Sequence, residues 1–409
     1  MRKVLAFGGV LALAACAGAP ARPARVMSGL DVLEAEGFAP LKGKRVGVIT
    51  NRTGIDARGR SIVDLLAAAP GVTLAAVYSS EHGFSATKET ANIASDRIQA
   101  AGRTIPLYSL FVGNVQRPTP GQLAGIDVLV FDIQDIGARF YTYLATMAMA
   151  LESAKEAGIE FVVLDRPNPI GGVLVEGPRV DEPGAVGKDP VSYFDVATRH
   201  GLTAGEMALL HNATVKHPRL TVVKMRNWKR SMWFDQTGLP WVPPSPNMPD
   251  LAAAALYPGV ANLEYSNLSV GRGTPAPFGW IGAPWLDANA LKERMNQALL
   301  EGVDFSAETR TPSKDIYAGQ ACPGLSIVVT DRDTARPLRV FAELAAALRD
   351  LEPNEFKLDW THTRRLVGRE RFFELYTAGA TGAEIARLFD ADAAEFEKTR
   401  APFLLYGNE

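Results

Sequence analysis

The stretch IDVLVFDIQDIGARFYTYLATMAMALESAKEAGIEFVVLDRPN, residues 126–168, decides the fold. It begins with an apolar run, continues with a helical segment over 140–158 that Gly158 ends, and closes with a second apolar run. A strand, a helix and a strand in this order form a βαβ unit with parallel strands. Both runs are apolar almost throughout rather than alternating, which is typical of a parallel sheet with helices on both faces.

The same alternation continues towards the N-terminus. Apolar runs over residues 44–50 and 72–79 flank a segment with helical spacing at 61–69, and they predict two further strands and a helix. A shorter run at 105–110 is a further candidate strand. Because successive units of this kind build one parallel sheet, the sequence predicts a Rossmann-like α/β domain over residues 28–240.

A proline-rich segment separates this domain from the rest of the chain. WVPPSPNMPD, residues 241–250, has four prolines in ten residues, which excludes regular structure and indicates a stiff connection. Beyond it, helical and strand-like segments alternate again. A chain of 409 residues is long enough for two cores, and we expect a smaller α/β domain over 251–409.

Charge and motifs exclude several classes of function. The formal net charge is −2, which leaves no basic surplus for a phosphate backbone, so we expect no nucleic-acid partner. No G-x-G-x-x-G follows the first strand, and the segment from Gly37 to Gly43 has the wrong spacing for a phosphate-binding loop. The five histidines show no spacing typical of metal ligands. We therefore expect no cofactor and no metal, and the chemistry is left to carboxylates, arginines and amides.

The N-terminus is typical of an exported protein. Arg2 and Lys3 precede an apolar stretch that is too short to span a membrane. LAAC, ending at Cys16, has the pattern of a bacterial lipoprotein signal over residues 1–16, in which the cysteine is lipidated; the alternative is a soluble export signal. We expect a periplasmic protein whose only membrane contact is an N-terminal lipid anchor, and Ala17 favours the outer membrane.

Polar residues follow successive apolar runs at the points where the predicted strands end. A single polar residue there more often caps the next helix than performs chemistry. The carboxyl ends of parallel strands lie at one edge of a sheet, however, and that edge is where open α/β sheets bind ligands. One cleft can therefore collect side chains from four segments: Asn51; Glu81 and His82; Asp132, Gln134 and Asp135; Asp165, Arg166 and Asn168.

Several of these segments match a known family. SSEHGF, GIDVLVFDIQDIGARFYTYLATM, VVLDRPNPIGG and NLEYSNLSVGRGT closely resemble the NamZ exo-β-N-acetylmuramidases, and the resemblance covers essentially the whole mature chain. It implies a glycoside hydrolase that removes N-acetylmuramic acid from the non-reducing end of peptidoglycan fragments. It also implies a cleft between a Rossmann-like domain and a smaller α/β domain, with Glu81 as the catalytic glutamate.

The chemistry of glycoside cleavage assigns further roles. Glu81 is the candidate acid that protonates the leaving oxygen. His82 orients Glu81 or a sugar hydroxyl, or is a loop histidine with a structural hydrogen bond. The second catalytic group is a nucleophile, a base for water, or an acid that holds the acetamido group of the substrate. Asp132 and Asp135 are the first candidates for it, and Glu264 is the next.

Substrate recognition requires a cation, because N-acetylmuramic acid carries a lactyl carboxylate. A guanidinium matches a carboxylate with two parallel hydrogen bonds, and Arg272, between two glycines, is the first candidate to bind it. Arg139 and Arg166 are the others, and Arg166 has the alternative role of an ion pair between the domains. Further candidates serve sugar hydroxyls or the acetamido group, or stack on a sugar face: Asn51, Gln134, Asp165, Asn168, Asn267, Tyr141, Tyr265 and Trp280.

Two other classes of protein remain open. One is a lipid-anchored binding protein whose two lobes close on a cell-wall sugar without chemistry. The other is an esterase or amidase that acts on wall material, which the missing G-x-S-x-G motif disfavours.

Overall fold

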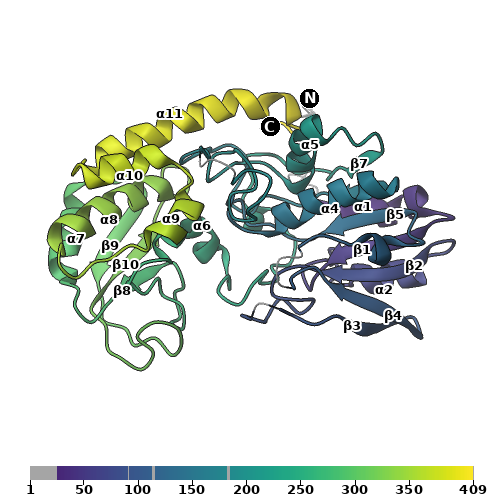
Figure 1. Ribbon diagram of the computed structural model, residues 1–409, viewed down its shortest axis with the longest axis horizontal. Helices are drawn as coiled ribbons and strands as arrows, with labels where there is room; N and C mark the ends of the chain where they lie inside the picture. Colours follow the sequence, from purple (N-terminus) through teal and green to yellow (C-terminus); the bar gives the residue numbers. More distant parts are fainter. Residues whose placement is uncertain (1–24, 91, 113–115, 182–184, 409) are drawn as a thin grey trace, which may run out of the picture.

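The computed structural model describes residues 25–90, 92–112, 116–181 and 185–408 (Figure 1). The predicted signal segment 1–16, with Cys16, lies outside the described residues. The helices and strands form a larger α/β domain and a smaller one, which confirms the predicted fold class.

The larger domain is built on a seven-stranded sheet with the strand order β3-β4-β2-β1-β5-β6-β7. All neighbouring strands are parallel except β3, which pairs with β4 in the antiparallel direction. Taken alone, the parallel strands have the order 3-2-1-4-5-6 of a Rossmann fold. The strands are β1 (Arg45–Thr50), β2 (Thr73–Ser79), β3 (Asp96–Ala100), β4 (Arg103–Ser109), β5 (Val128–Asp132), β6 (Glu160–Leu164) and β7 (Leu220–Val223).

Helices cover both faces of this sheet, and successive residues of a strand enter different cores. In β5, Val130 packs into the core that α1 and α2 cover, whereas Phe131 packs into the core that contains α4. This explains why the strands are apolar throughout. The helices of this domain are α1 (Gly29–Ala35), α2 (Ile62–Ala68), α3 (Pro120–Leu123), α4 (Tyr143–Ala157) and α5 (Ala204–Val215), with short 3-10 helices η1 (Ala39–Leu41) and η2 (Phe234–Gln236).

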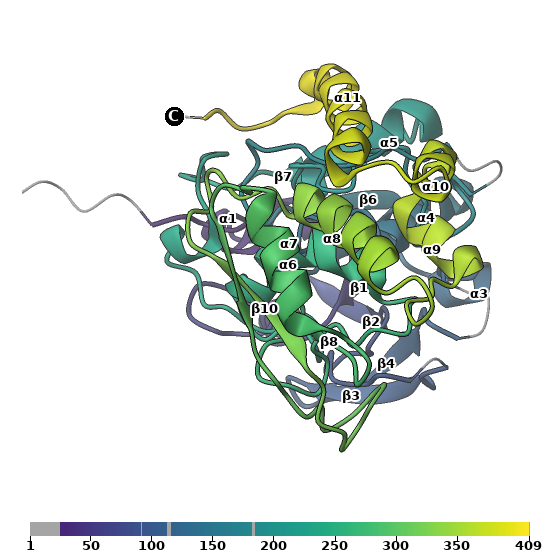
Figure 2. The same ribbon diagram turned by 90° about the vertical axis from the view of Figure 1, so that its left-hand side faces the viewer.

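The smaller domain has a three-stranded antiparallel sheet of order β8-β10-β9. Figure 2 looks onto this domain, with its helices in front of the larger sheet. Its strands are β8 (Trp280–Gly282), β9 (Val303–Ala307) and β10 (Gly324–Val329). Its helices are α6 (Leu251–Val260), η3 (Ala261–Leu263), α7 (Ala288–Gln297), α8 (Pro337–Leu351), α9 (Trp360–Val367), α10 (Glu370–Thr377), α11 (Gly382–Arg400) and η4 (Ala401–Phe403).

The C-terminal segment returns to the larger domain. Helix α11 runs along the top of Figure 1 from the smaller domain to the larger one. At its end the Arg400 guanidinium donates hydrogen bonds to the carbonyls of Gly172 and Gly201, and the Tyr406 hydroxyl donates to Asp165 at 2.6 Å. The two domains are therefore joined twice, by the proline-rich linker and by this segment.

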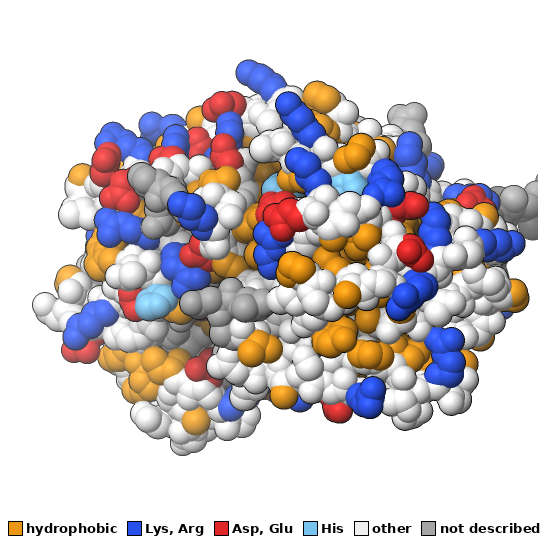
Figure 3. Space-filling view, turned by 45° about the vertical axis from the view of Figure 1, so that its right-hand side comes forward, with side chains coloured by type: hydrophobic (Ala, Val, Ile, Leu, Met, Phe, Trp, Pro, Cys, Tyr) orange, Lys and Arg blue, Asp and Glu red, His pale blue; other side chains and the backbone are white. Residues whose placement is uncertain are grey.

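The surface carries charges of both signs. On the face in Figure 3, Lys and Arg side chains lie among Asp and Glu side chains, as the formal net charge of −2 leads us to expect. None of the helices within the described residues combines the length and the apolar character that a membrane span requires.

Candidate active site

A pocket of about 310 Å³ lies where the two domains meet. The larger domain lines it mainly with the segments after β2 and before α4, and the smaller domain lines it with α6 and the segment that follows. The predicted residues in the pocket are Glu81, His82, Tyr141, Glu264, Tyr265 and Arg272. The other lining residues are Glu89, Phe140, Thr142, Val191, Ser245, Asn247, Met248, Tyr257, Phe278 and Leu366.

Glu81 lies just beyond the carboxyl end of β2, and a hydroxyl on α4 holds its carboxylate in place. Thr142 is the N-cap residue of α4, yet its side chain makes no capping bond. Its hydroxyl instead donates a hydrogen bond to Glu81. The carboxylate thus lies near the positive end of the α4 dipole. Thr142 was not among the predicted residues, because the helix was expected to begin at residue 140, whereas α4 begins at Tyr143 and leaves Thr142 at its N-cap.

His82 is fixed by its backbone and by its ring. Its φ of 65° is left-handed, which is uncommon for a residue other than glycine. Its Nδ1 lies 2.6 Å from the carbonyl oxygen of Lys88. Because a carbonyl only accepts, Nδ1 must carry the proton, and in the neutral ring Nε2 is an acceptor. His82 can therefore accept a hydrogen bond from a substrate hydroxyl.

Glu264 brings a second carboxylate into the pocket from the smaller domain. It directly follows η3 and forms an ion pair with Arg272. Burial raises the pKa of Glu264, the Arg272 guanidinium opposes this effect, and repulsion from Glu81 adds to it. The two glutamates thus act on each other across the domain boundary. Arg272 also has Asp315 at 3.9 Å from its Nε, and this nitrogen makes no hydrogen bond to any described residue.

Aromatic rings from both domains form one wall of the pocket. The Tyr141 and Tyr257 rings lie edge to face with centroids 5.8 Å apart, and Tyr257 packs in the same way on Phe278 at 4.7 Å. Burial raises the pKa of Tyr141 and of Tyr257 well above the usual value, so both hydroxyls stay neutral. The Tyr141 hydroxyl has no well-formed hydrogen bond among the described residues, although Ser245 lies close enough to lower its pKa.

Asp132 and Arg166 lie outside this pocket, paired with each other. The Arg166 Nε and Nη2 atoms lie 2.6 and 2.9 Å from the Asp132 carboxylate oxygens. The Asp132 side chain has no exposed area, and that of Arg166 is 7% exposed. Both residues belong to the larger domain, so this pair does not hold the two domains together. Arg139 does link the domains, because its guanidinium donates to the carbonyl of Pro178 in the larger domain and to that of Val367 in the smaller one.

Asp135 and Asp165 are also buried away from the pocket. Burial raises the pKa of Asp135 to about 7 and that of Asp165 to about 6. Asp135 accepts a hydrogen bond from the Gly137 amide at 2.7 Å and lies 3.8 Å from the His200 ring. Asp165 accepts from the Thr203 hydroxyl at 2.7 Å.

The predicted amide residues bond to backbone groups of their own loops and of neighbouring loops. Asn51 accepts from the Thr53 amide, Gln134 donates to the carbonyls of Asp135 and Pro167, Asn168 donates to the carbonyl of Leu202, and Asn267 donates to the carbonyl of Glu355. Trp280 has a fully buried side chain and donates to the carbonyl of Glu308. None of these side chains lines the pocket that holds Glu81.

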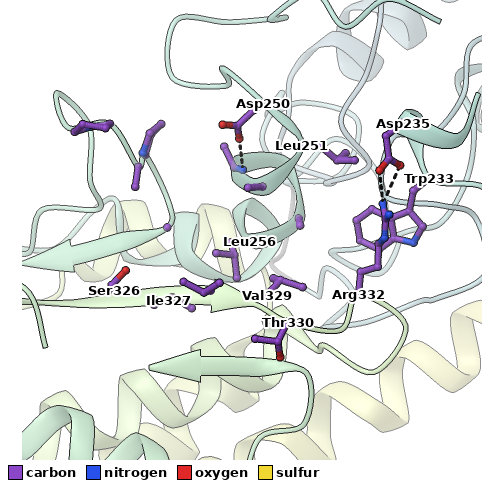
Figure 4. A pocket seen from close by; sticks show the side chains of 18 of the residues that line it. Trp233, Asp235, Asp250, Leu251, Leu256, Ser326, Ile327, Val329, Thr330 and Arg332 are labelled. Atoms are coloured by element: carbon purple, nitrogen blue, oxygen red, sulfur yellow. Dashed lines mark hydrogen bonds and ion pairs between the residues drawn. The ribbon is translucent and has the colours of Figure 1, made fainter. Parts of the chain in front are cut away.

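A larger pocket of about 520 Å³ lies elsewhere, along α6 and β10 (Figure 4). Its lining is mostly apolar. Asp235 is paired with Arg332 at 2.8 Å, and Asp250 accepts from the Ala253 amide at the start of α6. The smaller pocket is the better candidate for chemistry despite its size, because it brings the predicted residues Glu81, Glu264 and Arg272 together.

A pocket between two α/β domains, with carboxylates from both domains and an aromatic wall, defines the class: a carboxylate-based glycosidase site on a Rossmann-like scaffold. The family models for exo-beta-N-acetylmuramidase NamZ match residues 46–252 with the N-terminal part and 255–406 with the C-terminal part. The chain therefore belongs to the NamZ exo-β-N-acetylmuramidase family.

Individual relatives agree with this assignment. The peptidoglycan beta-N-acetylmuramidase NamZ of Bacillus subtilis (strain 168) is 39% identical over 388 residues, which is 94% of this chain and 92% of the relative. A crystal structure of a DUF1343 family protein from Bacteroides fragilis has 35% identity and a TM-score of 0.85, covering 93% of this chain and 99% of that protein. A second protein of that family from the same organism has 26% identity and a TM-score of 0.72, covering 94% of this chain and 100% of that protein.

Proposed function

We propose that this chain is an exo-β-N-acetylmuramidase, which hydrolyses the glycosidic bond of a terminal N-acetylmuramic acid residue in peptidoglycan fragments. Membership of the NamZ family and the relative in Bacillus subtilis support the activity and the substrate. The observation that carries the proposal is the meeting of Glu81 and Glu264 in one pocket.

Glu81 is the group that protonates the leaving oxygen. Thr142 fixes the position of the Glu81 carboxyl group. A proton on Glu81 can therefore be transferred to a bound glycoside without prior reorientation of the side chain. Cleavage then moves the bonding electron pair to the leaving oxygen and leaves an oxocarbenium-like sugar ring. His82 Nε2 is placed to accept from a hydroxyl of that ring.

Glu264 is the second group, in place of Asp132 and Asp135. It acts in one of three ways, as a nucleophile, as a base for water, or as the acid that holds the acetamido group. The anomer that is first released distinguishes an inverting base from the other two roles. A substrate without the acetamido group then separates the nucleophile from substrate assistance.

Arg272 is the proposed ligand of the lactyl carboxylate, and its contact with Glu264 gives it a second role to be tested. If Arg272 binds the lactyl group, Arg272→Lys should lower kcat/KM on muramides by about tenfold or more and spare any activity on N-acetylglucosaminides. If Arg272 only holds Glu264, both activities should fall together.

Turnover of chromogenic N-acetylmuramides by Glu81→Gln tests the function. Glutamine keeps the size of the side chain but cannot donate the acid proton, so kcat should fall by at least about 10²-fold with little change in melting temperature. The matched control is Glu89→Gln, another acid of the same pocket, which should keep most of kcat, although the loss of its ion pair with Lys314 should raise KM. Near-normal turnover by Glu81→Gln would remove Glu81 from the role of acid, and intact sugar binding without product from the parent would favour the binding-protein class.

A lipid anchor at Cys16 is the proposed means of localisation, with the protein held at the periplasmic face of a membrane. Changing Cys16 to Ser should release the protein from the membrane fraction or block its processing. If the variant fractionates as the parent does, the protein is not a lipoprotein of this kind.

A further inference from the structure

One aromatic ring of the pocket stands at its exposed edge. Tyr265 lines the pocket, yet 38% of the residue is exposed. Its ring is stacked on the His362 ring, with centroids 4.9 Å apart and an angle of 24° between the planes. No other aromatic ring of the described residues stacks on it. Its hydroxyl makes no hydrogen bond to a described residue. Burial raises the pKa of Tyr265, Glu264 and Glu81 add to this effect, and Arg365 and Arg272 oppose it.

The Tyr265 ring is held in place from behind. The His362 Nδ1 lies 2.8 Å from the Asp359 carboxylate, which also caps α9 by accepting from the His362 amide. The Asp359 amide in turn donates to the carbonyl of Tyr265 at 2.8 Å. Tyr265, His362 and Asp359 thus each contact the other two. A ligand that stacks on the Tyr265 ring therefore meets a surface that is already ordered.

The direction of the substrate follows from the exposure of the residues that line this pocket. Glu81 is partly buried there and is fixed by Thr142, so the sugar whose bond is cleaved must reach it. An enzyme that removes the terminal sugar leaves the rest of the chain on the open side, where Tyr265 lies half exposed. The apolar face of a pyranose packs on an aromatic ring as another apolar surface does.

We propose that Tyr265, supported by His362, is the platform for the sugar on the leaving side of the scissile bond, an N-acetylglucosamine residue in peptidoglycan. This inference rests on the proposed function and adds a specificity determinant to it. The platform makes the protein bind N-acetylmuramic acid more tightly when it is linked to a further sugar than when it is free.

Calorimetric binding to the Glu81→Gln protein tests the platform, because this background does not consume the ligand. Two ligands are compared, free N-acetylmuramic acid and the disaccharide in which it is linked to N-acetylglucosamine. The Kd of free N-acetylmuramic acid divided by the Kd of the disaccharide isolates the contribution of the second sugar. Adding Tyr265→Ala should reduce that ratio about three- to tenfold, His362→Ala should reduce it less, and Tyr265→Phe should keep it.

Trp360→Ala is the matched control. Trp360 is on the same helix as His362 and is also 38% exposed, but it does not line this pocket, so the ratio should not change. An unchanged ratio in Tyr265→Ala, or an equal loss in Trp360→Ala, would overturn the platform while the muramidase proposal stands. Failure of the Glu81→Gln protein to bind either ligand would overturn the muramidase proposal and the platform with it.

Discussion

Replacing Asp132 by Asn should destabilise the fold without removing the chemistry. Asp132 has no exposed side-chain area and forms two hydrogen bonds of 2.6 and 2.9 Å with Arg166. Burial raises the pKa of Asp132, and the Arg166 guanidinium opposes that effect. Neither residue lines the pocket that holds Glu81. The substitution therefore leaves a buried cation without its partner, at a distance from the reacting groups.

The size of the effect follows from the burial of the pair. Removing one partner of a buried ion pair costs about 3–5 kcal/mol, because the remaining charge stays desolvated. For a domain of this size, in which 1 kcal/mol shifts the melting temperature by about 2–4 °C, we expect a loss of about 6–20 °C. Replacing both partners with apolar residues, Asp132→Leu with Arg166→Met, should recover much of this loss. The recovery stays partial because Arg166 also donates to the carbonyl of Ile55.

Thermal unfolding and turnover of the same preparation provide the assay. We expect Asp132→Asn to melt earlier and to keep kcat within about threefold when measured well below its melting temperature, since it removes no general acid. Asp304→Asn, an exposed aspartate on β9, is the control and should change the free energy of unfolding by less than about 0.5 kcal/mol. An unchanged melting temperature with a kcat reduced about 10²-fold would refute this reasoning and make Asp132 the second catalytic group.

Two further predictions concern pH and domain closure. Burial raises the pKa of Asp135 to about 7, so between pH about 4 and 7 the folded protein keeps a proton that the unfolded chain has released, and its free energy of unfolding falls as the pH rises. Asp135→Asn cannot ionise, and its melting temperature relative to the parent should therefore be higher at pH 8 than at pH 5; a constant difference would contradict the buried, protonated carboxyl. Lys314, from the smaller domain, pairs with Glu89 at 2.6 Å with both side chains half exposed, so Lys314→Met should raise KM up to about fivefold with an unchanged melting temperature. The parent should show the same rise in KM at high salt. If KM responds neither to Lys314→Met nor to salt, the Lys314–Glu89 pair does not help to hold the two domains together around the pocket.

Much of the fold could be predicted because its strands are buried on both faces. The apolar run before Asp132 predicted β5 and the run before Asp165 predicted β6, and α4 ends at Gly158 as expected. Strand β3 was missed. It lies at the edge of the sheet, its residues are mostly exposed, and it therefore lacks the apolar pattern that identifies a buried strand.

The candidate site could be predicted only in part. Glu81 and Arg272 lie in the pocket as expected. Both could be predicted because each belongs to a segment that resembles the family. Asp132 and Asn168 lie at the expected edge of the sheet, but they satisfy buried groups of neighbouring loops. A polar residue after a strand can serve a ligand or a loop, since buried polar groups must find partners in either case. The partner chosen depends on residues far along the chain, which local pattern does not reveal.

The division of the site between two domains gives the domain contacts a role in catalysis. Glu81 belongs to the larger domain and Glu264 to the smaller one, so their separation is set by how the domains are joined. In glycosidases that use two carboxylates, about 5–5.5 Å between them suits direct attack on the sugar, whereas about 6.5–9.5 Å admits a water molecule. A shift of a few ångströms between the domains would thus change the reaction that the site can perform. Arg139, which ties the larger domain to the end of α9, and Arg400, which ties α11 to the larger domain, both act against such a shift.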